Sequence, residues 1–294
     1  MRRRSSPKWH HERMSELTSP NLTFSDGNTI PQLGFGVWRV ADDVAERAVS
    51  EAFEVGYRHI DTARIYGNEE GVGRAIKSSG LKPEELFITT KIWNADHGYD
   101  NALRAFDASM DRLGLETLNL LLIHWMVPAK GQHVETWKAL VELQKQGRVK
   151  SIGVSNFSTK AIDDVVAETG VSPVIHQVET HPHFQQRELA AYEREHNILH
   201  ESYSPLGSGK GLLDEAVFAE IGARVGATPA QVVLAWHLAK GFVVIPKTVT
   251  TSRIRENLES VNVQLSAEDI ALIDGMDRGE AGRVGSDPLT ANFE

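Results

Sequence analysis

Four polar side chains are the residues of this sequence best suited to proton-transfer chemistry: Asp61, Tyr66, Lys91 and His124. An Asp beside a Lys stabilises the ammonium form, and an ammonium beside a Tyr favours phenolate, which lowers the pKa of the phenol. Tyr66 is therefore expected to be a general acid that works nearer neutral pH. His124 is expected to hydrogen-bond an incoming carbonyl group and orient it. A structural ion pair or a satisfied core histidine would explain each residue alone, but not the four together.

Three of these residues stand at the ends of short apolar runs, and Tyr66 follows Asp61 by five positions. The runs alternate with stretches that carry apolar residues at helical spacing, which is typical of strands and helices that alternate along the chain. The runs are Leu33–Gly36, His59–Asp61, Phe87–Lys91, Asn119–His124, Ser151–Ser155, Val174–Glu179, Ile198–Ser204 and Phe242–Pro246. The helical stretches are Asp42–Val55, Asn68–Ser79, Asp100–Leu113, Val134–Lys145, Thr159–Thr169, Gln186–His196, Thr228–Ala239, Arg253–Ser260 and Ala267–Asp274.

Eight strands, each followed by a helix, predict an α/β fold of the (β/α)8 TIM barrel type rather than an open sheet. An open dinucleotide-binding sheet is disfavoured because Arg39 stands where the third Gly of its fingerprint is needed. The carboxyl ends of barrel strands converge on one face, where active sites lie. Asp61, Lys91 and His124 are therefore expected to be neighbours on that face, with Tyr66 on the loop above them.

The segments outside this repeating pattern predict a simple organisation. Leu22–Pro31 contains Asp26-Gly27 between two β-prone runs and predicts an N-terminal β-hairpin. Asp277–Glu294 is expected to be a tail over the active-site face. Residues 19–294 are expected to form one barrel domain, preceded by a disordered extension over residues 1–18. That start is basic but lacks the apolar segment of a signal peptide, so a cytoplasmic location is expected.

Composition excludes several classes of function. The chain has 294 residues, no cysteine, and a formal charge of −9 from 31 basic and 40 acidic side chains. Without cysteine there are no disulfides, thiolate metal sites or cysteine nucleophiles. The negative charge argues against a nucleic-acid partner or an anionic membrane surface, and no apolar run is long enough to span a bilayer.

At the four polar residues and the strand ends around them, the sequence resembles the aldo-keto reductases. It is most similar to the bacterial branch that contains diketo-gluconate and methylglyoxal reductases. The resemblance extends from about Leu22 to Pro288, and its motifs come in the expected order. They are Leu33–Gly36, Asp61–Ala63, Tyr66–Glu69, Thr90–Trp93, Leu121–Trp125, Gly153–Phe157, Gln177–Glu179 with His181 and Pro182, Tyr203–Gly207, Ile245–Thr248 and Arg253–Asn257.

The resemblance implies an enzyme that uses NADPH, without a metal, to reduce aldehydes and ketones to alcohols by hydride transfer. Small dicarbonyls and keto-sugars are the implied substrates, and a monomer is the implied state. Asp61, Tyr66, Lys91 and His124 match the family's four catalytic residues. Tyr66 is the implied proton donor, Lys91 and Asp61 tune it, and His124 positions the carbonyl.

The resemblance also implies which residues hold the cofactor and the substrate. At the nicotinamide, the implied carboxamide ligands are Ser155, Asn156 and Gln177, and Tyr203 is implied to stack against the ring. The implied pyrophosphate ligands are Ser204, Leu206 and Ser208. The implied 2′-phosphate ligands are Lys247, Thr248 and Arg253. Glu256 and Asn257 are implied at the adenine. The implied substrate pocket comprises Trp38, Trp93, His97 and Trp125.

Two departures from the family pattern lie beside the implied carboxamide site. His176 stands where Asn commonly precedes Gln, and Thr180 where Leu is common, and both are expected to affect cofactor affinity. Two further functions stay open: a non-catalytic NADPH-binding regulatory subunit on the same fold, and a barrel isomerase or hydrolase. A metal cluster of His176, His181 and His183 is disfavoured, because strand alternation turns His176 away from the site.

Overall fold

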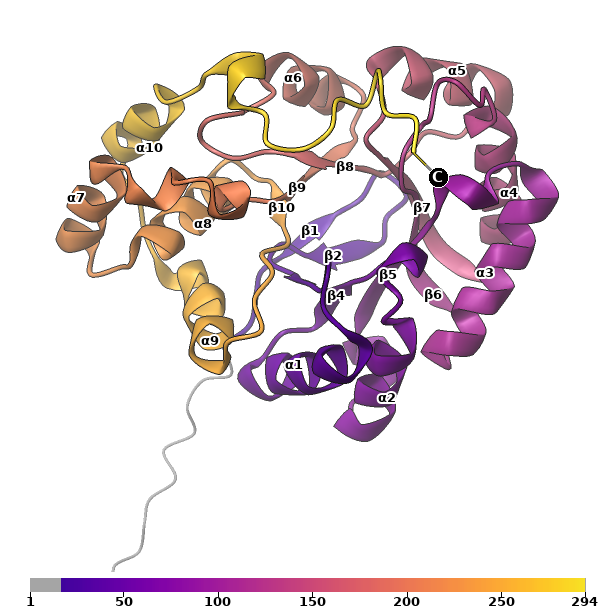
Figure 1. The fold of residues 1–294 in the computed structure, drawn as a ribbon, viewed down its shortest axis with the longest axis horizontal. Helices are drawn as coiled ribbons and strands as arrows, with labels where there is room; N and C mark the ends of the chain where they lie inside the picture. Colours follow the sequence, from indigo (N-terminus) through magenta and orange to yellow (C-terminus); the bar gives the residue numbers. More distant parts are fainter. Residues whose placement is uncertain (1–16, 294) are drawn as a thin grey trace, which may run out of the picture.

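Eight parallel strands curl into a barrel in the computed structural model, which describes residues 17–293 (Figure 1). The strands are β3 (Phe35–Gly36), β4 (His59–Asp61), β5 (Phe87–Ile92), β6 (Leu118–Ile123), β7 (Val149–Ser155), β8 (Ile175–Glu179), β9 (Leu199–Tyr203) and β10 (Val243–Val244), paired in chain order. Parallel bridges from Leu33 to Val244 and from Gly36 to Lys247 join the first strand to the last. The sheet is therefore closed, and the predicted (β/α)8 barrel is confirmed.

Helices surround the barrel in Figure 1. They are α1 (Asp42–Val55), α2 (Glu69–Ser79), α3 (Tyr99–Leu113), α4 (His133–Lys145), α5 (Thr159–Thr169), α6 (Arg187–Glu195), α7 (Ala216–Val225), α8 (Pro229–Ala239), α9 (Thr251–Glu259) and α10 (Ala267–Asp274). Helix α7 is not among the predicted helices. Its Gly222 weakens the helical signal, but only a glycine fits there, because an added Cβ would lie 2.4 Å from the carbonyl oxygen of Ala227.

The predicted hairpin is present and covers one end of the barrel. Strands β1 (Asn21–Thr23) and β2 (Thr29–Pro31) pair antiparallel, with Leu22 opposite Ile30. Phe24 and Ile30 pack in one apolar cluster with Leu120 and Leu122 of β6 and with side chains of neighbouring strands. This cluster fills the barrel at the amino ends of the strands, so the carboxyl ends are left for the site.

Strand alternation gives β8 and β9 two distinct faces. Gln177 pairs with Glu201 in register, and the adjacent pair is His176 with His200. Successive side chains of a strand point to opposite faces, so the first pair lies inside the barrel and the second faces the surrounding helices. Both pairs are buried, which leaves polar groups on either side of these strands that need partners.

The C-terminal segment crosses the barrel after α10, as the yellow trace in Figure 1 shows. The Glu179 carboxylate at the end of β8 accepts hydrogen bonds from the backbone N–H groups of Val284 (2.5 Å) and Gly285 (2.7 Å). Phe293 of the tail lies beside residues that follow β5 and β6. The expected tail over the active-site face is therefore confirmed.

No helix within residues 17–293 is both long and apolar enough to cross a membrane. Residues 1–16 of the expected extension lie outside the described residues, and Leu17 already packs against the barrel's apolar core. We propose that residues 19–294 form a single domain, because the sheet closes on itself and no linker interrupts it.

Candidate active site

Asp61 and Lys91 form a buried ion pair at the carboxyl ends of β4 and β5. The Lys91 ammonium donates to Asp61 Oδ1 at 2.6 Å and to the carbonyl oxygen of Thr62 at 2.9 Å. Lys91 is only 1% exposed. A charge removed from water this completely needs a partner, and adjacent strands supply one. The predicted neighbourhood of these two side chains is present.

Tyr66 reaches the ion pair from the loop after β4. It ends a one-turn helix, η1 (Arg64–Tyr66), which stops at Gly67 with a φ of 66°. Asn68 then holds the loop, because its buried amide donates to the carbonyl oxygens of Val37 and Val40, both at 2.9 Å. The result is that Lys91 Nζ lies 5.3 Å from the centre of the Tyr66 ring.

His124 follows β6 and completes the group of four predicted residues. Its ring meets that of Tyr66 edge to face, with centroids 5.7 Å apart, and that of Trp93 at 5.2 Å. Burial, and then the charge of Lys91, lowers the pKa of His124 well below its usual value. The imidazole is therefore neutral at physiological pH and can donate one hydrogen bond without carrying charge.

The prediction that Lys91 lowers the pKa of Tyr66 is wrong for this structure. The pKa of Tyr66 is raised well above its usual value, first by burial and then by the negative charge of Asp61 and of Glu201. The Lys91 ammonium donates its hydrogen bonds to Asp61 and to the Thr62 carbonyl, and its charge does not outweigh these effects while the phenol keeps its proton. Tyr66 therefore stays protonated, which is the form a proton donor requires.

The predicted carboxamide ligands converge on the same site from β7, β8 and β9. Asn156 has a left-handed φ of 54°, and its amide donates to Ser155 Oγ and to the carbonyl oxygen of His124, both at 3.0 Å. The Tyr203 hydroxyl donates to Asn156 Oδ1 at 2.9 Å. Gln177 Nε2 donates to Asp61 Oδ2 at 2.8 Å. The predicted cofactor residues and the predicted catalytic residues are thus joined by hydrogen bonds.

The predicted phosphate and adenine residues lie on the loops after β9 and β10 and on α9. They are Ser204, Leu206, Ser208, Lys247, Thr248, Arg253, Glu256 and Asn257. Lys247 and Arg253 are exposed, and neither has an ion-pair partner among residues 17–293. The Glu256 carboxylate, in contrast, already has a partner, because it accepts a hydrogen bond of 2.7 Å from the Thr228 hydroxyl just before α8. Two free cations remain, which suits a phosphate.

The predicted pocket aromatics are not equivalent in the structure. Trp93 and Trp125 both contact Phe293 of the tail, with ring centroids at 6.0 and 5.1 Å. Trp38 is 45% exposed, and the Arg39 guanidinium lies over its ring. His97 is buried, and within residues 17–293 neither of its ring nitrogens has a hydrogen-bond partner. Phe293 was not predicted, because no motif marks a tail residue that joins the site only after folding.

Glu201 is a second site residue that sequence reasoning missed. It lies inside the barrel on β9, where its Oε2 accepts a 2.9 Å hydrogen bond from Gln177 Nε2. That amide also donates to Asp61, so it bridges two buried carboxyl groups. Burial first, and then the charge of Asp61, raises the pKa of Glu201 to about 8. The sequence signal that could have identified Glu201 is the presence of a charged residue within the strand Leu199–Tyr203.

The raised pKa of Glu201 predicts a pH-dependent contribution to stability. The folded state holds this proton at pH values where the unfolded chain, with a pKa of 4.5, has lost it. The contribution is complete below pH 4.5 and is lost as the pH rises through about 8. Glu201→Gln keeps a neutral acceptor for Gln177 but cannot ionise. We expect wild type to lose stability relative to this variant between pH 5 and 8.5, by at most about 5 kcal/mol.

Urea unfolding of both proteins across this pH range measures the difference. Glu220→Gln, on the exposed side of α7, serves as the matched control and should show no such trend. A constant difference between wild type and Glu201→Gln would show that Glu201 is ionised in the folded protein throughout.

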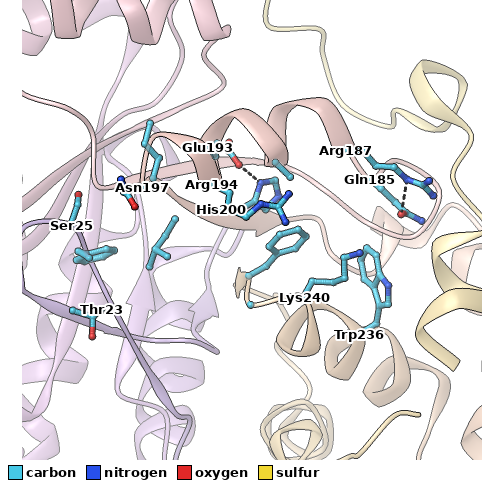
Figure 2. A pocket seen from close by; sticks show the side chains of 16 residues that line it. Thr23, Ser25, Gln185, Arg187, Glu193, Arg194, Asn197, His200, Trp236 and Lys240 are labelled. Carbon is cyan, nitrogen blue, oxygen red and sulfur yellow. Dashed lines mark hydrogen bonds and ion pairs between the residues drawn. The ribbon is translucent and has the colours of Figure 1, made fainter. Parts of the chain in front are cut away.

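Figure 2 shows a groove on the molecule. It has a volume of about 620 Å³ and is lined by the hairpin, α6, the start of β9 and the end of α8, with Phe24, Arg194, His200, Trp236 and Phe242 among its residues. No predicted site residue lines it. The chemistry is therefore assigned to the strand ends, where the tail residue Phe293 packs between the two tryptophans.

The closed barrel with its site at the carboxyl ends of the strands has the architecture of a TIM-barrel enzyme. Residues 32–278 match the Aldo/keto reductase family. Methylglyoxal reductase DkgA of Escherichia coli is 47% identical over 91% of this chain and 96% of its own length. The chain belongs to the aldo/keto reductase family.

Solved structures agree with this assignment. The structure of Gox0644 in its apo form is 49% identical, with a TM-score of 0.90, over 94% of this chain and 99% of that one. A mutant of Gox0644 in complex with NADPH is 48% identical, with a TM-score of 0.89, over the same shares of both chains.

Proposed function

We propose that this protein reduces aldehydes and ketones to alcohols with NADPH, and that Tyr66 is the proton donor. The observation that carries the proposal is the packing of one protonated phenol, one buried ammonium and one neutral imidazole at the strand ends. Bound NADPH supplies the hydride that the carbonyl carbon accepts. The carbonyl oxygen takes the Tyr66 proton, so the products are an alcohol and NADP⁺.

Each residue of this group has a distinct part in the reaction. His124 donates a hydrogen bond that orients the carbonyl oxygen toward the Tyr66 hydroxyl. Lys91, fixed by Asp61, lies near enough to stabilise the phenolate that forms as the proton leaves. The phenol then regains a proton from solvent. No step needs a metal, and the acid is neutral before the reaction, which suits a buried site.

The described residues also fit the cofactor. Ser155, Asn156 and Gln177 present amide and hydroxyl groups at one place, as a carboxamide needs, and Tyr203 adds an aromatic face. Lys247 and Arg253 offer charges that no carboxylate in residues 17–293 neutralises. Arg in particular can bind a phosphate through two parallel hydrogen bonds.

The proposed substrates are small dicarbonyls and keto-sugars. The aromatic rings of Trp93, Trp125 and the tail residue Phe293 gather beside His124, and a relative that is 47% identical is named methylglyoxal reductase. We also propose a monomer, because every site residue comes from one chain, and a cytoplasmic location, because NADPH is regenerated inside cells.

Loss of NADPH absorbance in the presence of methylglyoxal, a diketo-gluconate and simple aldehydes tests the proposal. We expect turnover with at least one of these carbonyls, and the ranking of kcat/KM to favour small dicarbonyls. A protein that binds NADPH but oxidises it with none of them would instead be the regulatory subunit. A protein active without nicotinamide would be the isomerase or hydrolase.

Arg253→Ala tests the role of α9 in choosing between the two nicotinamide cofactors. A lost charged hydrogen bond to the 2′-phosphate should raise the Kd for NADPH by about 10- to 100-fold. The Kd for NADH, which lacks that phosphate, should barely change. Tryptophan fluorescence quenching measures both constants. Arg255→Ala, exposed on the same helix, is the matched control, and equal weakening of NADPH and NADH by Arg253→Ala would refute this role.

A further inference from the structure

Four buried polar side chains form a continuous hydrogen-bonded chain on the outer face of β8 and β9. Glu193 of α6 lies between two histidines, with Oε1 2.7 Å from His176 Nδ1 and Oε2 2.6 Å from His200 Nδ1. His200 Nε2 lies 2.8 Å from Thr180 Oγ1. All four side chains are buried, and Figure 2 shows Glu193 and His200 meeting beneath α6. We refer to His176, Glu193, His200 and Thr180 as the outer chain.

One end of the outer chain contacts the residue after the proposed nicotinamide ligand Asn156, and the other end contacts the backbone of the proposed ligand Tyr203. At one end, His176 Nε2 accepts a hydrogen bond of 3.1 Å from the backbone N–H of Phe157, the residue after Asn156. At the other end, the backbone N–H of Thr180 donates to the Tyr203 carbonyl oxygen at 3.3 Å. The Tyr203 hydroxyl then donates to Asn156 Oδ1. The contacts therefore form a closed circuit that passes through Asn156 and Tyr203.

The hydrogen bond from Phe157 fixes the donor and the acceptor at the His176 end of the outer chain. Because His176 Nε2 accepts from Phe157, its proton must lie on Nδ1, which donates to Glu193. Burial opposes ionisation of Glu193, but the two histidines outweigh it and lower the pKa of this carboxyl. A buried carboxylate with two donors is a rigid junction, because loss of either donor leaves charge uncompensated.

Asn156 needs such support. Its φ of 54° lies in the left-handed region, which Asn adopts more readily than most residues but which still costs free energy that the surroundings must offset. The His176 contact fixes the peptide that follows Asn156, and the Tyr203 contact fixes its side chain. The outer chain thus constrains this residue from both directions.

We propose that the outer chain is a positioning device for the nicotinamide end of the cofactor, acting on Asn156 and Tyr203 through His176 and Thr180. The inference rests on the proposed function, since it takes these two residues as nicotinamide ligands. The outer chain contacts no reacting atom, so its members are positioning residues.

The opposing interpretation is that the outer chain only fastens α6 to the sheet. Loss of any member would then lower stability and weaken every part of the cofactor site alike. Positioning predicts a different pattern, in which the nicotinamide end alone loses affinity. A ligand with the phosphates and adenine but without the nicotinamide separates the two, and 2′-phospho-ADP-ribose is such a ligand.

Binding of NADPH and of 2′-phospho-ADP-ribose to the full chain, measured by calorimetry, tests the inference. His176→Leu removes the acceptor for Phe157, and Thr180→Val removes the hydroxyl at the other end with little change in shape. We expect each variant to raise the Kd for NADPH by about tenfold, as the loss of one buried hydrogen bond implies. The Kd for 2′-phospho-ADP-ribose should stay within about twofold of wild type.

Two further variants sharpen the test. His176→Gln still offers an oxygen to the Phe157 N–H and should restore much of the NADPH affinity that His176→Leu loses. Val49→Ala, buried in α1 on another side of the barrel, lowers stability without touching the outer chain and should leave both ligands unaffected. Equal weakening of the two ligands, or no change in either, would overturn the inference. Wild type that binds neither ligand would overturn the proposed function, and this inference with it.

Discussion

Tyr66→Phe is expected to lower kcat for carbonyl reduction by about 10²- to 10⁴-fold, the usual contribution of a positioned general acid. The variant keeps the ring that packs against His124 and lies over Lys91, so the shape of the site is preserved. Only the transferable proton is lost. The Kd for NADPH should therefore stay within about twofold, since the phenol hydroxyl is not among the proposed cofactor ligands.

Steady-state NADPH oxidation and fluorescence titration measure these two quantities. Tyr57→Phe is the matched control, because the Tyr57 hydroxyl is buried and has no hydrogen-bond partner within residues 17–293. Its removal should leave kcat unchanged. Tyr66→Phe with turnover close to wild type would show that another group, or water, supplies the proton.

The raised pKa of Tyr66 adds a pH signature to this experiment. The phenol holds its proton throughout the neutral range, because burial, Asp61 and Glu201 all disfavour phenolate. Carbonyl reduction by wild type should therefore show no loss of the acid form as the pH rises from 6 to 9. The reverse reaction needs phenolate as the base, so alcohol oxidation should rise over the same interval.

Most of the fold was predictable from the sequence, because local pattern and barrel geometry agree. Helix α1 and strand β4 have the predicted bounds, Asp42–Val55 and His59–Asp61. Their apolar residues face a core that any (β/α)8 barrel must fill. Helix α7, which was not predicted, depends instead on the close approach of Gly222 to the backbone of Ala227. Helix propensity alone treats a glycine at this position as unfavourable.

The site was predictable to the extent that strand ends define it. Asp61, Lys91 and His124 come together because three adjacent strands end at one face. The sign of the Tyr66 pKa shift was not predictable, since it depends on which acceptors occupy the Lys91 ammonium and on a second buried carboxyl, Glu201. Those facts depend on hydrogen-bond geometry, which spacing along the chain does not contain.

Lys91→Met is expected to remove most turnover and also to destabilise the protein by about 3–5 kcal/mol. The side chains have similar length, so packing is largely kept, but Asp61 loses its counter-charge in a buried place. Among residues 17–293, the Gln177 amide is then the one side chain that still donates to the Asp61 carboxylate. A buried charge left with one neutral donor costs far more free energy than the intact pair contributes. Chemical denaturation and NADPH oxidation measure the two effects.

The double variant Lys91→Met/Asp61→Asn separates stability from chemistry. Removing both charges eliminates the unpaired carboxylate, so the free energy of unfolding should recover by more than half, whereas turnover should remain as low as in Lys91→Met. That outcome would assign the ammonium a direct part in stabilising the Tyr66 phenolate. Recovery of turnover together with stability would show that Lys91 serves the fold alone, because a neutral pair would then suffice for catalysis.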